Sequence, residues 1–236
     1  MKTNARLFAV LWLLCGLPLL ALAQADAAAR DIVKSYQSGK VNGVELTILL
    51  VQENGALLPV EPQRAFKTGE QIKLALESNF GGYLYIVNYG SSGKQSVIFP
   101  CGGEDNRITP RQKYLLPNRC AFAFDENTGT EVLKVFTSRQ PIAFLAAAAK
   151  RADGALRQRG AAQLEQWWQD GGAQAPGISG SSVKMASARA VESRDPIWDA
   201  KKKTALVTLR QPKGTSGKLM RNKVAMFRIN FNNAGR

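Results

Sequence analysis

Gly82–Tyr89, with the sequence GYLYIVNY, is the stretch that decides the fold of this chain. Its side chains are aromatic or apolar on both faces, which predicts a central strand of a sheet. Gly90–Gly93 follows as a loop whose glycines permit positive φ, and it leads into the apolar segment Val97–Phe99. Together these segments predict a β-hairpin.

Segments with a period of two lie on both sides of this hairpin. Apolar residues alternate with other residues over 44–50 and over 71–77, and two further strands are expected at 120–124 and 131–137. Residues 100–118 lack this pattern and are interpreted as a long irregular stretch. Six strands in about ninety residues predict a mainly β fold, an antiparallel β-sandwich or barrel-like sheet, with its core at 44–140.

The remaining segments are expected to extend this core. Residues 24–43 predict a leader or short helix, and the alanine-rich residues 141–170 have helical spacing, weakened by Gly154 and Gly160 into two shorter helices. Residues 171–183 have the composition of a flexible linker. Two strands are expected at 204–210 and 224–231, within the basic region 184–236. We expect them to complete the main sheet rather than to pair with each other, because an isolated hairpin is marginal in water.

Residues 1–23 have the three parts of a secretory signal peptide. Lys2 and Arg6 precede an apolar run from Leu7 to Leu22, and Ala21 and Ala23 are small residues at the expected cleavage site. The run is too short and too poorly flanked for a spanning helix, so no transmembrane segment is expected after cleavage. We therefore expect an exported chain, periplasmic or secreted.

Cleavage would also remove Cys15, leaving Cys101 and Cys120 as a pair. In an oxidising compartment an even cysteine count favours a disulfide. Closing this loop would stabilise the fold by roughly 3 kcal/mol in the chain-entropy treatment. A redox role is disfavoured, because redox pairs usually have only two residues between the cysteines.

Positive charge is concentrated in the last quarter of the chain. The formal net charge is +14, and residues 184–236 carry thirteen Lys or Arg against three acidic residues. Such a region favours an anionic partner, namely lipid headgroups, an acidic glycan or an acidic protein surface, although a solvated loop and tail is the alternative. No nucleic-acid recognition motif is present, so nucleic acid is not expected. The candidate binding residues in this region are Lys201, Lys202, Lys203, Arg221 and Lys223.

Residues that could carry chemistry are few. The chain has no histidine, which excludes histidine-dependent catalysis and histidine-based zinc sites, and we expect no cofactor and no metal. Ser181 and Lys184 fit the S-x-x-K element of penicillin-recognising enzymes, and Lys67-Thr68-Gly69 fits their K-T-G element. Their order is reversed and Ser181 lies in the predicted linker, so chance is the better account.

Tyr83, Tyr85 and Tyr89 are expected on one face of the central strand. Such a face could stack on a sugar or a peptide, and the alternative is packing within the fold.

Several stretches of the chain resemble the bacterial family called domain of unknown function 4384. The resemblance lies in FKTGEQIKL (66–74), ESN (77–79) and GYLYIVN (82–88), and it continues through TSRQP (137–141), over about 66–142. It implies a mostly β accessory domain of exported proteins, of the kind also found beside peptidase-like and kinase-like modules. The family supplies no catalytic residues, so the resemblance assigns none here.

These observations favour a non-enzymatic, exported β-domain that acts as a binding or scaffold component of the bacterial cell envelope. The partner would be an envelope protein or an anionic envelope polymer, with contact to a membrane surface also allowed. One alternative is a carbohydrate- or peptide-binding module that uses the tyrosine face of 83–89. A third is a serine hydrolase of cell-wall material acting through Ser181 and Lys184. The oligomeric state is left open.

Overall fold

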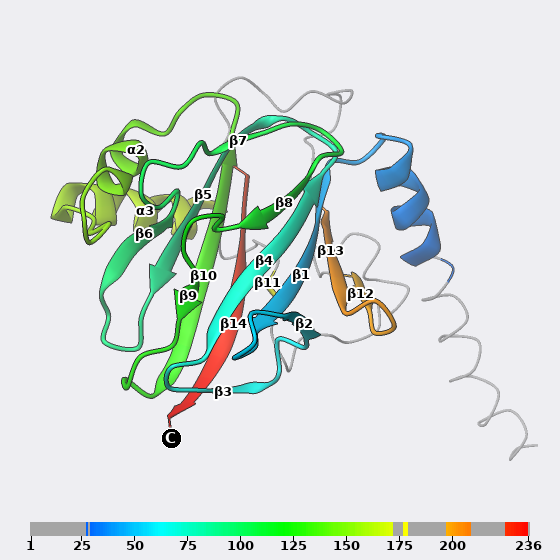
Figure 1. Cartoon of the computed structure of the whole chain (residues 1–236). Coiled ribbons are helices and arrows are strands. Elements are labelled where there is room, and N and C mark those ends of the chain that lie inside the picture. The colour runs from blue at the N-terminus through cyan, green and yellow to red at the C-terminus, as the bar shows by residue number, and fades with distance from the viewer. Residues whose placement is uncertain (1–26, 28, 172–176, 179–196, 209–224, 236) are drawn as a thin grey trace, which may run out of the picture.

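The computed structural model describes residues 27, 29–171, 177–178, 197–208 and 225–235. Two sheets face each other and form a sandwich, with two helices on the outer face of one sheet (Figure 1). The predicted mainly β fold is confirmed. The two sheets remain separate in the described residues, so the architecture is the sandwich and not a closed barrel.

The first sheet is built around β1 and β4, whose apolar residues alternate as the sequence predicts. Ile72, Leu74 and Leu76 of β4 point into the core, and the residues between them are partly exposed. All pairs in this sheet are antiparallel. Its order is β12 (Ile197–Asp199), β13 (Thr204–Thr208), β1 (Gly43–Val51), β4 (Gln71–Ser78) and β8 (Lys113–Leu116), with β2 (Leu57–Val60) on β1 and β9 (Phe122–Ala123) on β4.

The second sheet contains the predicted central strand and hairpin. Its order is β11 (Gly177–Ile178), β14 (Ala225–Gly235), β10 (Gly129–Ser138), β5 (Gly82–Tyr89) and β6 (Gln95–Phe99), with β3 (Ala65–Lys67) on β14 and β7 (Arg107–Ile108) on β5. β5 has β10 on one side and β6 on the other, and β11 and β3 run parallel to β14. Residues 177–178 of the predicted linker thus form a strand.

The two C-terminal strands add to different sheets. β13 pairs with β1 in the first sheet, and β14 pairs with β10 over nine residue pairs in the second. The basic C-terminal region therefore contributes to both layers of the sandwich.

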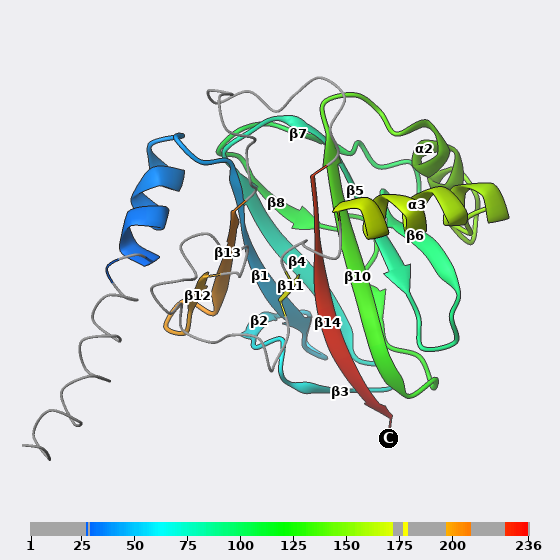
Figure 2. The same ribbon diagram turned by 180° about the vertical axis from the view of Figure 1, so that it is seen from behind.

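Two hydrophobic clusters explain why β5 is apolar on both faces. Leu84 and Ile86 point into the core between the sheets. Tyr85 and Val87 point to the outer face, where they pack with Leu145 and other residues of the helical segment. That segment forms α2 (Ala143–Ala149) and α3 (Gln158–Gly171), which lie over the second sheet (Figure 2). No helix in the described part of the chain is long and apolar enough to cross a membrane.

An N-terminal helix at 29–37 lies at the side of the sandwich (Figure 1). Arg111 donates to the carbonyl oxygens of Tyr36 and Gln37, both at 2.7 Å, and its guanidinium lies 4.7 Å from the centre of the Tyr36 ring. Asn79 also donates to the Tyr36 carbonyl, at 3.0 Å. A cation at a helix C-terminus is favourable, so these contacts fix the helix to the first sheet.

Tyr36 should make the stability of the protein sensitive to alkaline pH. Burial raises the pKa of its hydroxyl well above the ordinary value of 10.0, and the nearby Glu45 carboxylate raises it further. The unfolded chain therefore releases this proton at lower pH than the folded chain, so stability is retained below pH 10.0 and falls as the pH rises above it.

We expect the free energy of unfolding to fall less in Tyr36→Phe than in the wild type between about pH 9 and about pH 11. Urea unfolding at both pH values measures this difference. Tyr83→Phe is the matched control, since Tyr83 is only half-buried and lies on β5 of the second sheet. Equal losses in the wild type and Tyr36→Phe would contradict the assignment.

Candidate functional site

A cavity of about 410 Å³ opens at one end of the sandwich, between the two sheets. Its floor is apolar and comes from both layers. Leu133 and Phe231 belong to the second sheet, and Ile72 and Phe122 belong to the first. The volume lies in the range of small-molecule sites, which are concave and largely apolar with a few polar groups.

Three of the polar residues that line the cavity lie on strands of the second sheet. Asn88 near the end of β5 and Ser96 of β6 are cross-strand partners, so their side chains leave the same face of the sheet. The Asn88 Oδ1 atom is buried and has no hydrogen-bond partner. Glu131 of β10 also lines the cavity, and one of its carboxylate oxygens accepts the Ser91 backbone N–H at 3.0 Å.

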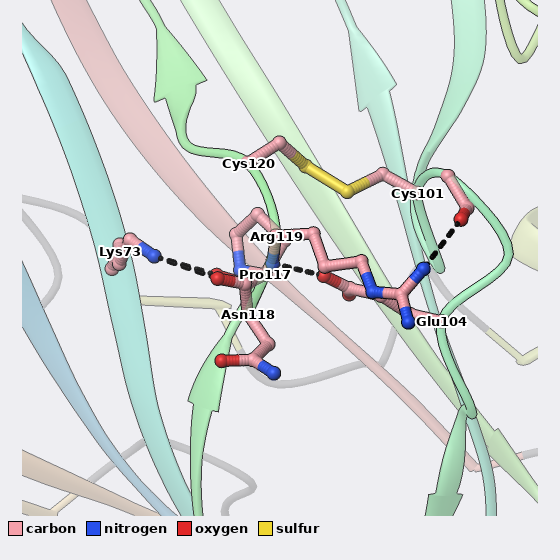
Figure 3. Close-up of a disulfide and its surroundings, with 8 residues drawn as sticks. Lys73, Cys101, Glu104, Pro117, Asn118, Arg119 and Cys120 are labelled. Carbon is pink, nitrogen blue, oxygen red and sulfur yellow. Dashed lines mark hydrogen bonds between the residues drawn. A yellow bond between two sulfur atoms is a disulfide. The ribbon is translucent and has the colours of Figure 1, made fainter.

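A disulfide between Cys101 and Cys120 lines one wall, as predicted (Figure 3). It joins the loop that follows β6 to the loop that precedes β9, and therefore links the two sheets. Glu104 accepts the Arg119 backbone N–H, and Arg119 donates to the Gly102 carbonyl at 3.3 Å. These bonds hold the two loops together beside the disulfide.

Lys73 supports the same wall from β4. Its ammonium group donates to the Pro117 and Asn118 carbonyl oxygens at 3.1 and 3.2 Å (Figure 3). Cys101, Glu104 and Cys120 lie close together, but the sulfurs are bonded to each other, so they are not free thiolate ligands for a metal.

The connection between α2 and α3 also lines the cavity. Gly154 accepts the Val97 backbone N–H at 2.9 Å, and Leu156 donates to the Gln95 carbonyl at 3.3 Å. These bonds occupy the outer edge of β6. Gly154 has φ +62°, and a Cβ here would lie 2.1 Å from the Val97 oxygen, so only glycine allows this approach.

Comparison with known proteins finds a family that matches part of the chain. Residues 65–141 match the family described as Domain of unknown function (DUF4384). The resemblance predicted from the sequence is confirmed over these residues. No curated protein and no solved structure matches the chain.

The DUF4384 match contains most of the cavity. It runs from β3 to just before α2, and so includes Asn88, Ser96, Glu131 and both cysteines. The wall at 149–154 and the floor residue Phe231 lie outside the matched region.

The tyrosine face of this DUF4384 region is on the other side of β5 and packs against the helical segment. Tyr85 is only 1% exposed, and its hydroxyl accepts the Ile142 backbone N–H at 3.2 Å, so a ligand cannot stack on it. Tyr83 and Tyr89 are half-buried, and the Lys134 ammonium lies 3.6 Å from the centre of the Tyr89 ring. Stacking on this face stays a prediction for Tyr83 and Tyr89.

Lys134 is a buried charge beneath α3. Its Nζ lies 3.8 Å from a Glu165 carboxylate oxygen. Burial lowers the pKa of the Lys134 ammonium, and Glu165 opposes this by favouring the charged form. Burial also disfavours the charged form of Tyr89, which raises the pKa of its hydroxyl. These groups fix α3 on the second sheet and lie outside the cavity.

The described candidates for anionic recognition form the turn between β12 and β13. Asp199 accepts the backbone N–H groups of Lys201 and Lys202 at 3.1 and 3.0 Å, and both lysines are exposed. Lys203 donates to the Pro59 carbonyl at 3.3 Å. Arg221, Lys223, Ser181, Lys184 and the predicted signal peptide lie outside the described residues. Lys67 is the last residue of β3, and Thr68-Gly69 begins the connection to β4.

Asn88, Ser96 and Glu131 were not singled out from the sequence. The signal that could have found Asn88 is its position, because it continues the inward row of Leu84 and Ile86 as a polar residue. A polar side chain in such a row indicates where the core opens.

Proposed function

We propose that this protein is an exported, non-enzymatic β-domain that binds another component of the bacterial cell envelope through the cavity beside the disulfide. The observation that carries the proposal is Asn88, which lines a cavity with an apolar floor and whose Oδ1 atom is buried without a hydrogen-bond partner. A buried acceptor without a partner is costly, and a donor from a ligand would satisfy it.

The charge distribution supports an anionic partner, either an envelope protein or an anionic polymer. Lys201 and Lys202 are exposed at the turn between β12 and β13, and Lys202 is 3.7 Å from the Asp199 carboxylate. An exposed pair of this kind is weak, so both lysines can reorient toward phosphate or carboxylate groups. They would strengthen association at low salt, while the cavity would supply specificity.

Capture from envelope extract on immobilised residues 24–236 tests the proposal. We expect Ser96→Phe, which fills the cavity from β6, to reduce the amount of captured component at least about tenfold, because it removes the space for the ligand. The bound material is eluted with a salt gradient and identified by mass spectrometry.

Ser38→Phe is the matched control, since Ser38 lies in an exposed turn outside the cavity lining. Circular dichroism of both variants establishes that they fold. If folded Ser96→Phe captured the same components as Ser38→Phe, the cavity would not be the binding site.

A further inference from the structure

We infer that the cavity binds a neutral, hydroxyl-rich group, namely a sugar ring of an envelope glycan. This inference rests on the proposed function and specifies the chemistry of its ligand. Its site is the inner face of β5 and β6, not the tyrosine face on the other side of β5.

Two polar side chains on the inner face, Asn88 and Ser96, are uncharged and match hydroxyl chemistry. The Asn88 Oδ1 atom needs a donor, its amide group can donate, and the adjacent Ser96 hydroxyl can do both. A sugar hydroxyl both donates and accepts, so one ring can satisfy the two side chains. A fully ionised phosphate or carboxylate has no proton for Oδ1.

The charged residues that line the cavity have both signs, so they favour neither an anionic nor a cationic ligand. Lys94 and Arg151 are positive, and Asp125, Glu131 and Asp153 are negative. Several already have partners within the protein. The Asp125 carboxylate accepts from the backbone and side-chain nitrogens of Asn127, and an Asp153 oxygen accepts the Ala155 N–H. Charges of both signs, partly engaged, favour a neutral polar ligand over an ionic one.

The apolar part of the cavity suits the CH face of a sugar. Phe122 is half-buried and comes from β9 of the first sheet, while Asn88 and Ser96 come from the second sheet. A ring between the two sheets would have an aromatic side chain and polar groups on different sides. Apolar surface beside directed polar groups is a feature that this cavity shares with small-molecule sites.

A peptide is less compatible with the surroundings of the cavity. Extended peptides commonly bind by adding a strand to a free sheet edge. Residues 154–156 already pair with the outer edge of β6 beside the cavity, through the bonds between Gly154 and Val97 and between Leu156 and Gln95. That edge is therefore occupied.

Saturation-transfer NMR tests the inference, with maltotriose, cellotriose and chitotriose as sugar probes and trialanine as the peptide probe. We expect transfer to at least one sugar, and a dissociation constant at least about tenfold higher in Asn88→Leu, because the buried acceptor is lost. Ser96→Ala is a smaller change and should also weaken binding of that sugar. It serves as the test variant if Asn88→Leu does not fold. Asn232→Leu, at an exposed position of β14 outside the cavity lining, should bind as the wild type does.

Transfer to none of the sugars, or transfer equally strong in Asn88→Leu and Ser96→Ala, would overturn the inference. Transfer to trialanine alone would overturn it in favour of a peptide ligand. If the sugars fail while Ser96→Phe still abolishes envelope capture, the cavity remains a binding site and only the ligand class is wrong. If both experiments fail, the proposed function fails as well.

Discussion

Phe66→Ala is expected to lower the free energy of unfolding by about 3–5 kcal/mol, the usual cost of truncating a buried phenylalanine. Phe66 is 0% exposed. Its ring stacks on Phe124 with centroids 4.6 Å apart and meets Phe231 edge to face at 5.4 Å. Phe66 lies on β3 of the second sheet, whereas Phe124 immediately follows β9 of the first, so the cluster joins the two layers. Alanine would leave a void that the surrounding strands cannot close.

Urea unfolding followed by far-ultraviolet circular dichroism measures the effect of Phe66→Ala. Leu57→Ala is the control, because Leu57 is 38% exposed on β2 and its truncation should change stability by no more than about 0.5 kcal/mol. If Phe66→Ala changed the free energy of unfolding as little as Leu57→Ala does, the aromatic cluster would not join the layers as described.

The central part of the fold could be predicted because its physics is local. β5 is apolar on both faces since each face is covered, one by the opposing sheet and one by the helices. β4 alternates since only one of its faces is covered. The periodic burial of side chains is therefore visible in the pattern of apolar and polar residues, and the turn at 90–93 fixes the hairpin.

Other elements could not be predicted because their pairing is not local. β7 and β8 lie in residues 100–118, which lack alternation and are predicted to be irregular. They are short strands held by backbone bonds to β5 and β4, and they are too brief to show a period. The division of β13 and β14 between two sheets depends on contacts with strands more than eighty residues away, which the local sequence pattern does not encode.

The candidate site was predictable only in its covalent part. The disulfide between Cys101 and Cys120 could be predicted from the even number of cysteines and the expected oxidising compartment. The cavity, in contrast, is formed by residues of several strands that become neighbours only in the folded sandwich. The tyrosine face illustrates the converse. Spacing placed Tyr83, Tyr85 and Tyr89 on one face, but only the position of the helices decides that Tyr85 is inaccessible.

The double variant Cys101→Ser/Cys120→Ser is expected to lose about 3 kcal/mol of stability under oxidising conditions. The two cysteines are 19 residues apart, and the bond restricts the unfolded chain by closing this loop. It also links a loop of each sheet at the cavity wall. Its removal should therefore make the wall more mobile and increase the conformational entropy of the unfolded chain. Guanidinium unfolding of both proteins measures the difference in free energy.

Reduction provides an independent route to the same state, and it separates the bond from the serine substitutions. Dithiothreitol should lower the stability of the wild type to nearly that of the double variant and leave the double variant unchanged, because only the wild type has a bond to break. The hydrogen bonds of Arg119 to Glu104 and Gly102 remain in both, so the loops should stay near each other in the folded state and the loss should stay close to the entropic value. A wild type whose stability is the same with and without dithiothreitol, after the thiols have been shown to be free, would contradict a stabilising disulfide. A double variant that does not fold would mean that the bond holds the two sheets together, beyond its effect on the unfolded chain.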